Sequence, residues 1–169
     1  MGCVVTSAEQ KAAELGLVIP DYANPPYGRR YGRMKPFHRI GNLLELSGLT
    51  PETRDGERLH PGIIGEDVTI EQGYAAARLT AIHTLGMIRY ALGSLDNVKS
   101  LSRALCFVVA PPGFELLHEV SNGATDLFLE VFGDEAGSVG RASIGATTLS
   151  RNNCFELWLS LECHPEPGA

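Results

Sequence analysis

The spacing of apolar residues predicts two long amphipathic helices. Residues 70–92 place apolar side chains three and four positions apart, which is the repeat of a helix with one buried face. Thr69 and Gln72 resemble a capping box at the start of this helix, and Gly93 follows its end. Residues 115–132 show the same repeat, so a second amphipathic helix is expected there.

Shorter runs that alternate apolar and polar residues predict β-strands. Residues 37–49 are expected to form a hairpin with its turn at 41–42, and residues 98–110 a single strand. Residues 140–162 hold two further runs, which predict a second hairpin with its turn near 151–152. The order β-β-α-β-α-β-β favours a two-layer α+β sandwich, with one mixed sheet and both long helices on one face.

The first 36 residues are expected to form an N-terminal extension packed on a domain of residues 37–169. A short helix is predicted over 7–16, followed by a loop rich in Pro and Arg over 20–36. The opening MGCVVT fits a myristoylation pattern, but the pattern is short and no polybasic patch follows, so a frayed terminus without acylation is the favoured interpretation.

Composition narrows the class of protein. The chain has 169 residues, 44% of them apolar and 20% charged, which is typical of one globular domain. The net charge of −6 makes a nucleic-acid partner unlikely. We find no apolar run of the ~18 residues that a membrane span needs and no signal peptide. The four cysteines lack paired spacing and the five histidines lack metal-ligand spacing. We therefore expect a reduced, cytoplasmic protein without metal or cofactor.

Charged residues occupy positions in the last two predicted strands. Arg141 lies at the start of the first run and Glu156 near the start of the second. Because side chains alternate along a strand, Glu156 and Trp158 share one face while Phe155 and Leu157 share the other. A face that mixes acidic, hydroxyl and indole side chains is expected to contact another subunit.

Four segments occur in the order found in one known family. They are GNLLELSG (41–48), GEDVTIEQGYAAARLTAIHTLGMIRYALGSLDNV (65–98), SNGATDLFLEVFG (121–133) and RASIG (141–145). Together they resemble the RidA/YjgF family, and most of all its longer YjgF-like branch. The resemblance implies a chorismate-mutase-like fold, a homotrimer with clefts between subunits, and hydrolysis of reactive imines and enamines to 2-keto acids and ammonia.

The resemblance also implies roles for individual residues. Arg141 matches the arginine that holds the substrate carboxylate, and Glu156 falls at the spacing of the glutamate that positions water. Asn122 and Ser47 match residues that shape the cleft, and Ser143 falls where the main chain of a small residue lines it. An arginine suits this role because its planar guanidinium binds a carboxylate through two parallel hydrogen bonds.

Three positions depart from the family pattern. Met34 stands where the cleft tyrosine is expected, His118 where an aromatic residue is expected, and Trp158 where glutamate is frequent. The alternative to an enzyme is therefore a non-catalytic trimer that binds a small carboxylate or a protein partner in the same cleft. Purely structural roles also stay open, with Arg141 in an interface ion pair and Glu156 as an acceptor for main-chain N–H groups.

The predicted second hairpin makes a geometric prediction. Arg141 would pair near Leu161 or Glu162, so that Glu156 lies about six residues farther along, or roughly 20 Å at ~3.3 Å per residue. The two side chains could then contact one small molecule only from different subunits. A basic segment over 28–39 could attract RNA or another anion, but in an acidic protein a solvated segment or salt-bridge partner is the favoured interpretation.

Overall fold

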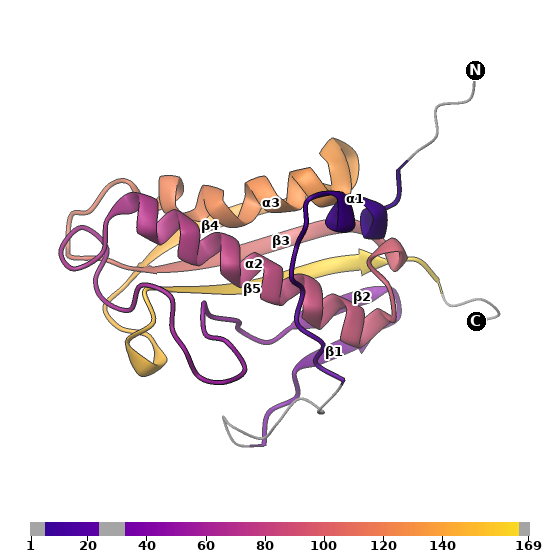
Figure 1. Cartoon of the computed structure of the whole chain (residues 1–169), viewed down its shortest axis with the longest axis horizontal. Coiled ribbons are helices and arrows are strands. Elements are labelled where there is room, and N and C mark those ends of the chain that lie inside the picture. The colour runs from indigo at the N-terminus through magenta and orange to yellow at the C-terminus, as the bar shows by residue number, and fades with distance from the viewer. Residues whose placement is uncertain (1–5, 24–32, 166–169) are drawn as a thin grey trace.

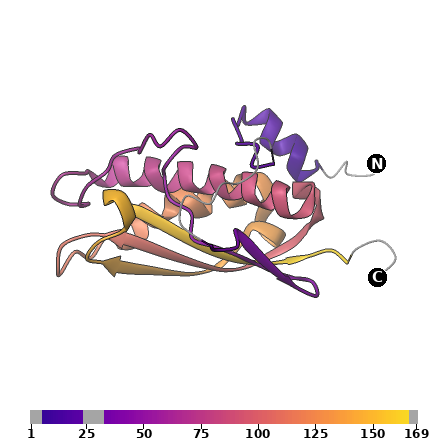
Figure 2. The same cartoon turned by 90° about the horizontal axis from the view of Figure 1, so that it is seen from below.

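A five-stranded sheet carries two long helices on one face in the computed structural model, which describes residues 6–23 and 33–165 (Figure 1). Figure 2 shows the two layers from the side, with the helices on one side of the sheet only. This arrangement confirms the predicted α+β class with one mixed sheet. In chain order the elements are α1 (Ala8–Glu14), β1 (Phe37–Ile40), β2 (Leu43–Leu46), α2 (Ile70–Leu92), η1 (Leu95–Asn97), β3 (Val98–Val109), α3 (Leu117–Gly137), β4 (Gly140–Ala146), η2 (Ser150–Asn152) and β5 (Phe155–Cys163).

The helix ends follow local chemistry. Helix α2 begins with the predicted capping box, in which Thr69 accepts from the backbone N–H of Gln72 and the Gln72 side chain accepts from that of Thr69. It ends at Gly93, which has left-handed backbone angles. Helix α3 continues to Gly137, beyond the predicted end, although Gly133 interrupts the helical angles with φ 75°. The first predicted hairpin forms as β1 and β2.

The second predicted hairpin is wrong. The strand order is β1-β2-β5-β3-β4, so β3 separates the two strands that were expected to pair. Strand β4 runs parallel to β3, and β5 runs antiparallel to β3 along its other edge. The eight residues 147–154, with η2 among them, therefore step across the end of β3 instead of closing a turn.

The helical connection explains this pairing. Helix α3 returns the chain from the end of β3 to its beginning, so the next strand lies parallel to β3, as in a βαβ unit. The other edge of β3 then takes β5, whose second edge pairs with β2. This central position buries Phe155, Leu157 and Leu161 almost completely. Strand β4 is left at the edge of the sheet.

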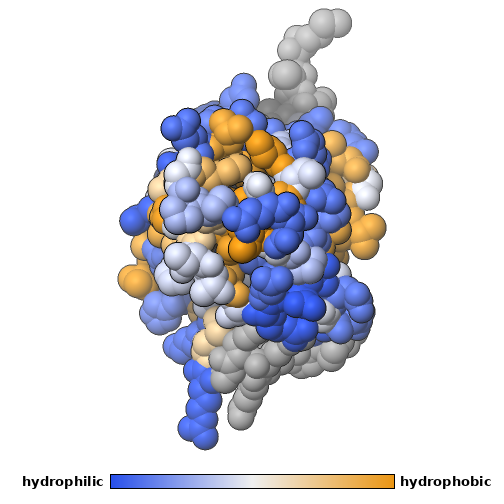
Figure 3. All heavy atoms as spheres, turned by 90° about the vertical axis from the view of Figure 1, so that its left-hand side faces the viewer, coloured by the Kyte–Doolittle hydropathy of each residue, from blue (hydrophilic) through white to orange (hydrophobic). Residues whose placement is uncertain are grey.

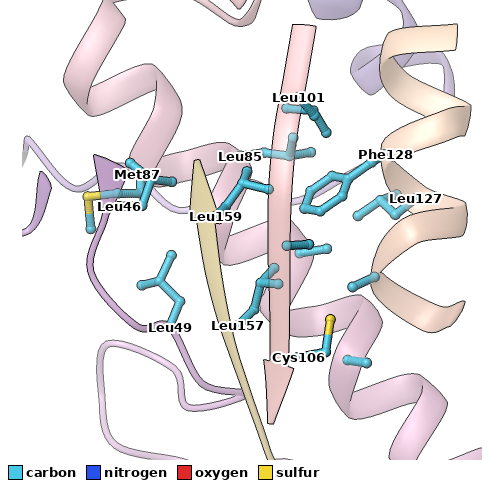
Figure 4. Close-up of a cluster of buried hydrophobic side chains, with 14 of the residues drawn as sticks. Leu46, Leu49, Leu85, Met87, Leu101, Cys106, Leu127, Phe128, Leu157 and Leu159 are labelled. Carbon is cyan, nitrogen blue, oxygen red and sulfur yellow. The ribbon is translucent and has the colours of Figure 1, made fainter. Parts of the chain in front are cut away.

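The main core lies between the sheet and the two long helices. In Figure 4, Leu85 of α2 and Phe128 of α3 point toward Leu101, Cys106 and Leu159 of the central strands. Each of these side chains is at most 4% exposed. Burial of this apolar surface is the dominant favourable contribution to folding, at roughly 25 cal/mol per Å².

A charged contact attaches the short helix α1 to the end of α2. The Glu9 carboxylate accepts two hydrogen bonds from Nε of Arg89, each 3.1 Å long, and one from its Nη2 at 2.5 Å. It also accepts from the backbone N–H of Leu95. Partial burial opposes ionisation, but these hydrogen bonds prevail and lower the pKa of Glu9. The division at residue 36 stays a prediction, and MGCVVT falls largely on residues 1–5, outside the described ranges.

The described ranges contain no candidate membrane span, and the cysteines within them are buried. No helix there has the length and apolar content needed to cross a membrane. Cys106, Cys154 and Cys163 are buried free thiols.

The close approach of α2 and α3 depends on Gly123. A Cβ added at this position would overlap the backbone carbonyl oxygen of Tyr74 on α2. We predict that Gly123→Ala forces the helices apart and lowers the free energy of unfolding by about 1–3 kcal/mol. Urea denaturation at one fixed protein concentration measures the change. Glu135→Ala, on the exposed part of the same helix, is the control and should shift the free energy by less than about 0.5 kcal/mol.

Candidate functional site

The residues predicted for the site form two separate groups within one chain. The first group lies between α3 and the edge strand β4, and the second lies on the helix-free face around β2 and β5. The first group contains His118, Asn122, Arg141 and Ser143, and the second contains Met34, Ser47 and Glu156.

Arg141 is held by neutral oxygen atoms of α3. Its Nη1 donates to Oδ1 of Asn122 and to Oγ1 of Thr125, both at 2.8 Å. Asn122 and Thr125 share one helix face because they are three residues apart. Within residues 6–23 and 33–165, no carboxylate forms an ion pair with Arg141, and Nη2 and Nε have no hydrogen-bond acceptor. The guanidinium is half-buried, oriented and without a counter-ion in the part of the chain described.

Ser143 extends the same group into the sheet. Its hydroxyl donates to Oγ of Ser121 on α3 at 2.9 Å. Cys106 is its partner on β3 and lies nearby, fully buried. Burial raises the pKa of the Cys106 thiol to about 11, with Ser121 and Arg141 acting in the opposite direction. Since the thiolate is the reactive form, Cys106 is a packing residue and not a nucleophile at neutral pH.

His118 lies at the far end of this group. It lines an open groove of about 520 Å³ between the starts of α2 and α3, together with Tyr74 and Asn122. Tyr74 donates its hydroxyl to Asp126 at 2.9 Å, and burial with this hydrogen bond raises the pKa of Tyr74. Figure 3 views the molecule from the end where α2 and α3 begin, and hydrophilic and hydrophobic side chains intermingle there. Asn122 lines this groove and also accepts a hydrogen bond from Arg141, so it connects the groove to the guanidinium.

The second group surrounds a cavity of about 550 Å³ on the other face of the sheet. Glu156 is half-buried in its wall, and its Oε1 accepts from the indole Nε1 of Trp158 at 2.7 Å. Met34 lines the same cavity and is 42% exposed. A volume in this range suits a small organic molecule. The expected alternative for Glu156, an acceptor of main-chain N–H groups, is not what the described contacts show.

Ser47 and Thr50 tie the cavity wall to the rest of the fold. The Ser47 hydroxyl donates to the backbone carbonyl of Lys35 at 2.6 Å, which holds the segment that carries Met34. The backbone carbonyl of Thr50 lies 3.1 Å from Nδ1 of His83, a buried residue of α2. Burial lowers the pKa of His83, although the hydrogen bond to Thr50 acts in the opposite direction.

Arg141 and Glu156 lie on opposite faces of the sheet. Arg141 pairs with Ala104 of β3, while Glu156 pairs with Phe107, three residues farther along. Two strand spacings and three residues separate their Cα atoms by about 14 Å. The predicted pairing of Arg141 near Leu161 is wrong, and so is the separation of roughly 20 Å derived from it. Because the sheet lies between them, the two side chains cannot contact one small molecule within a single chain.

Sequence reasoning missed two residues of these groups. Thr125 is the second acceptor for Arg141, and its position three residues after Asn122 was the available signal. Gly48 lies against the Glu156–Trp158 pair, where an added Cβ would be 2.6 Å from the indole Nε1. A glycine within a strand-like run was a general signal for such a close approach.

The described residues hold no cluster that could bind a metal ion, and they include only part of the basic segment over 28–39. No cluster of three or more His, Cys, Asp or Glu side chains within them could hold a metal ion. Residues 28–32 of the basic segment lie outside the described ranges. In the remainder, Nε of Arg39 donates to the carbonyl of Gly41 at 3.0 Å.

Comparison with known proteins adds a family and several relatives. Residues 10–161 match the family described as "YjgF/chorismate mutase-like, putative endoribonuclease". TCP17 of Trypanosoma cruzi is 38% identical over 109 residues, which cover 64% of this chain and 68% of that protein. Atu1372 of Agrobacterium tumefaciens, a protein of unknown function, has a similar structure with TM-score 0.80 and 30% identity, covering 92% of this chain and 91% of its own. A "putative endoribonuclease" of Shewanella oneidensis has TM-score 0.83 and 28% identity, covering 92% and 99%.

The buried His83 predicts a pH dependence of stability. Its pKa in the folded chain is lowered from the ordinary 6.5, so the unfolded chain takes up a proton first as the pH falls. The unfolded state then binds more protons than the folded state, and the free energy of unfolding decreases below about pH 6.5. We expect His83→Gln to lose less stability than the unaltered protein between pH 7.5 and 5. Urea denaturation of both proteins at both pH values measures this, and equal losses would contradict the assignment.

Proposed function

We propose that this chain, which belongs to the YjgF/chorismate-mutase-like family, hydrolyses reactive 2-imino and enamino acids to 2-keto acids and ammonia in clefts between the subunits of a homotrimer. The observation that carries the proposal is the Arg141 guanidinium. It is oriented by two neutral acceptors and has no carboxylate partner among the described residues, which leaves its charge for a ligand.

A carboxylate is the ligand that this geometry favours. Asn122 and Thr125 both hold Nη1, so Nη2 and Nε form the free edge of the guanidinium. That edge presents two parallel N–H groups at the spacing of two carboxylate oxygens. A half-buried position strengthens such a pair relative to one in water. A 2-imino acid carries its carboxylate next to the C=N carbon, so binding it there orients the reacting carbon.

Glu156 supplies the acid–base chemistry in the proposed cleft. Its carboxylate accepts a proton from water as the water oxygen bonds to the imine carbon, and the C=N electron pair moves to nitrogen. The same proton then passes to nitrogen. Glu156 then takes the hydroxyl proton of the resulting carbinolamine and delivers it to the amine nitrogen, so the carbon–nitrogen bond breaks as the carbonyl forms and ammonia leaves. Positioning contributes strongly because the imine already hydrolyses in water.

A shared cleft requires two subunits because Arg141 and Glu156 lie on opposite faces of one sheet. A closed trimer repeats one contact three times, so the Arg141 group of each subunit meets the Glu156 group of the next. Trp158, 49% exposed on the helix-free face, and Leu43, 37% exposed, are apolar surface that such an assembly would cover.

A non-catalytic trimer that binds a carboxylate is the second candidate. Met34 lies in the wall of the Glu156 cavity and has no hydroxyl to offer a substrate, unlike the tyrosine that the family resemblance leads one to expect there. The same Arg141 contact would hold the ligand in this case. RNA cleavage, suggested by the wording of the relatives' descriptions, is less favoured because the net charge is −6.

The first prediction for this function concerns Arg141. An amino-acid oxidase generates 2-imino acids, and semicarbazide traps whatever the protein has not hydrolysed. We expect the unaltered protein to reduce trapping and Arg141→Ala to lower kcat/KM at least about tenfold, because a charge-assisted bidentate contact is lost. Arg141→Lys should fall between them, since lysine keeps the charge without the planar fork.

Arg78→Ala is the matched control for the loss of an arginine. Arg78 pairs with Glu130 across α2 and α3, away from the residues proposed to bind substrate. It should leave the rate unchanged. Full activity in Arg141→Ala would remove Arg141 from the site, whereas a carboxylate that binds to a trimer without any imine hydrolysis would favour the second candidate.

Subunit mixing tests whether each cleft is shared. Arg141→Ala and Glu156→Gln should each be inactive as homotrimers. When both are co-expressed in equal amounts, random assembly leaves about one cleft in four with both native residues, because each cleft draws one residue from each neighbour. We expect about a quarter of the unaltered activity in the unfractionated mixture and about a third in trimers purified through two affinity tags, because every mixed trimer has one such cleft out of three. No recovery, with mixing confirmed by two affinity tags, would contradict an intersubunit site.

A further inference from the structure

Trp158 is the one tryptophan of the chain, and its indole is bound to Glu156. The side chains are two residues apart on β5 and point from the same face of the sheet. Nε1 of Trp158 donates to Oε1 of Glu156 at 2.7 Å, which is the length of a charge-assisted hydrogen bond. The indole also packs edge-on against Phe107, with ring centroids 5.7 Å apart and planes at 61°.

Gly48 presses this pair from the neighbouring segment. A Cβ at Gly48 would collide with Oε1 of Glu156 and lie 2.6 Å from Nε1 of Trp158. The backbone around it is fixed, since Leu49 and Leu157 exchange hydrogen bonds of 3.0 and 2.8 Å. The hydrogen bond between Trp158 and Glu156 therefore lies directly over the backbone of Gly48. Any other residue at position 48 would displace this pair.

We infer that Trp158 is a positioning and specificity-determining residue: its indole N–H holds Glu156 by one oxygen, and its ring forms the wall for an apolar substrate side chain. The inference rests on the proposed function. With Oε1 occupied by the indole, Oε2 is the carboxylate oxygen left to take and return a proton. A carboxylate fixed in this way stays in the orientation that proton transfer requires.

The cavity composition supports the second half of the inference. Trp158 and Met34, which are 49% and 42% exposed, both line the cavity, so one part of its wall is apolar. A branched or long apolar side chain of a substrate would displace water from this wall, whereas a methyl group would cover little of it. The protein should therefore prefer imino acids derived from large apolar amino acids over the imino acid derived from alanine.

Two substitutions separate the two roles of Trp158. Trp158→Phe keeps an aromatic ring and removes the N–H donor, so we expect kcat to fall about tenfold or more with little change in KM. Trp158→Gln keeps an N–H donor and removes the ring. We expect kcat to be largely retained and KM for the leucine-derived imino acid to rise about tenfold, with the preference over the alanine-derived one lost. Gly48→Ala should reproduce the loss of kcat, because it displaces the pair.

A control distinguishes these effects from loss of apolar surface. Ile40 is 59% exposed on β1 and is not part of the cavity wall. Ile40→Ala should leave both constants unchanged. Size-exclusion chromatography and circular dichroism of every variant establish that the assembly and fold persist. If Trp158→Phe and Trp158→Gln change kcat and KM by equal factors, or not at all, Trp158 has neither role.

Fluorescence of the single tryptophan gives a readout that does not need catalysis. Titration with 4-methyl-2-oxopentanoate, a stable 2-keto acid, should quench or shift the emission at lower concentrations than pyruvate, and Arg141→Ala should abolish the response. Such a response without imine hydrolysis supports Trp158 as the wall and contradicts the deaminase function. Arg141-dependent hydrolysis with unchanged Trp158 variants supports the function and overturns the inference. The absence of both response and hydrolysis overturns the two together.

Discussion

Strand β3 is hydrogen-bonded along both edges, and this double pairing decides where every candidate group lies. Because α3 brings the chain back to the beginning of β3, β4 joins one edge in parallel and places Arg141 beneath α3. The other edge takes β5, whose apolar face completes the core and whose remaining face carries Glu156 and Trp158. A direct β4–β5 hairpin would instead have placed Arg141 and Glu156 on adjacent strands, and each would then have neighbours other than those observed.

Arg141 differs from two other arginines of the fold in the partners that orient it. Arg141 is oriented by an amide oxygen and a hydroxyl, which hold the guanidinium without neutralising it. By comparison, Arg89 and Arg78 are already paired with Glu9 and Glu130, and these pairs join helices to one another. An arginine with neutral partners keeps its electrostatic attraction for an anion. In an arginine paired with a carboxylate, the partner's negative charge offsets most of that attraction. The difference between structural and candidate functional arginines is therefore visible in their partners.

The backbone approaches other groups closely at two glycines next to candidate site residues. At Gly123 the backbone of α3 reaches that of α2 at the carbonyl of Tyr74, one residue after Asn122, so the residue that holds Arg141 sits at a tight helix contact. At Gly48 the backbone reaches the carboxylate of Glu156 and the indole of Trp158. In both places the absence of a side chain lets a rigid element set the position of a functional group, which is more precise than support from a mobile loop.

The sequence by itself determined the local elements and the family. Helix α2, its capping box and the first hairpin follow from periodicity and turn chemistry within a few residues, and ordered motifs identified the fold class. Tertiary structure alone decided which strands pair, because two alternating runs joined by a polar stretch fit either a hairpin or a step across another strand. That choice placed Arg141 and Glu156 on opposite faces and brought Thr125 and Gly48 to them. Such contacts depend on pairings between residues distant in the chain, which no local pattern encodes.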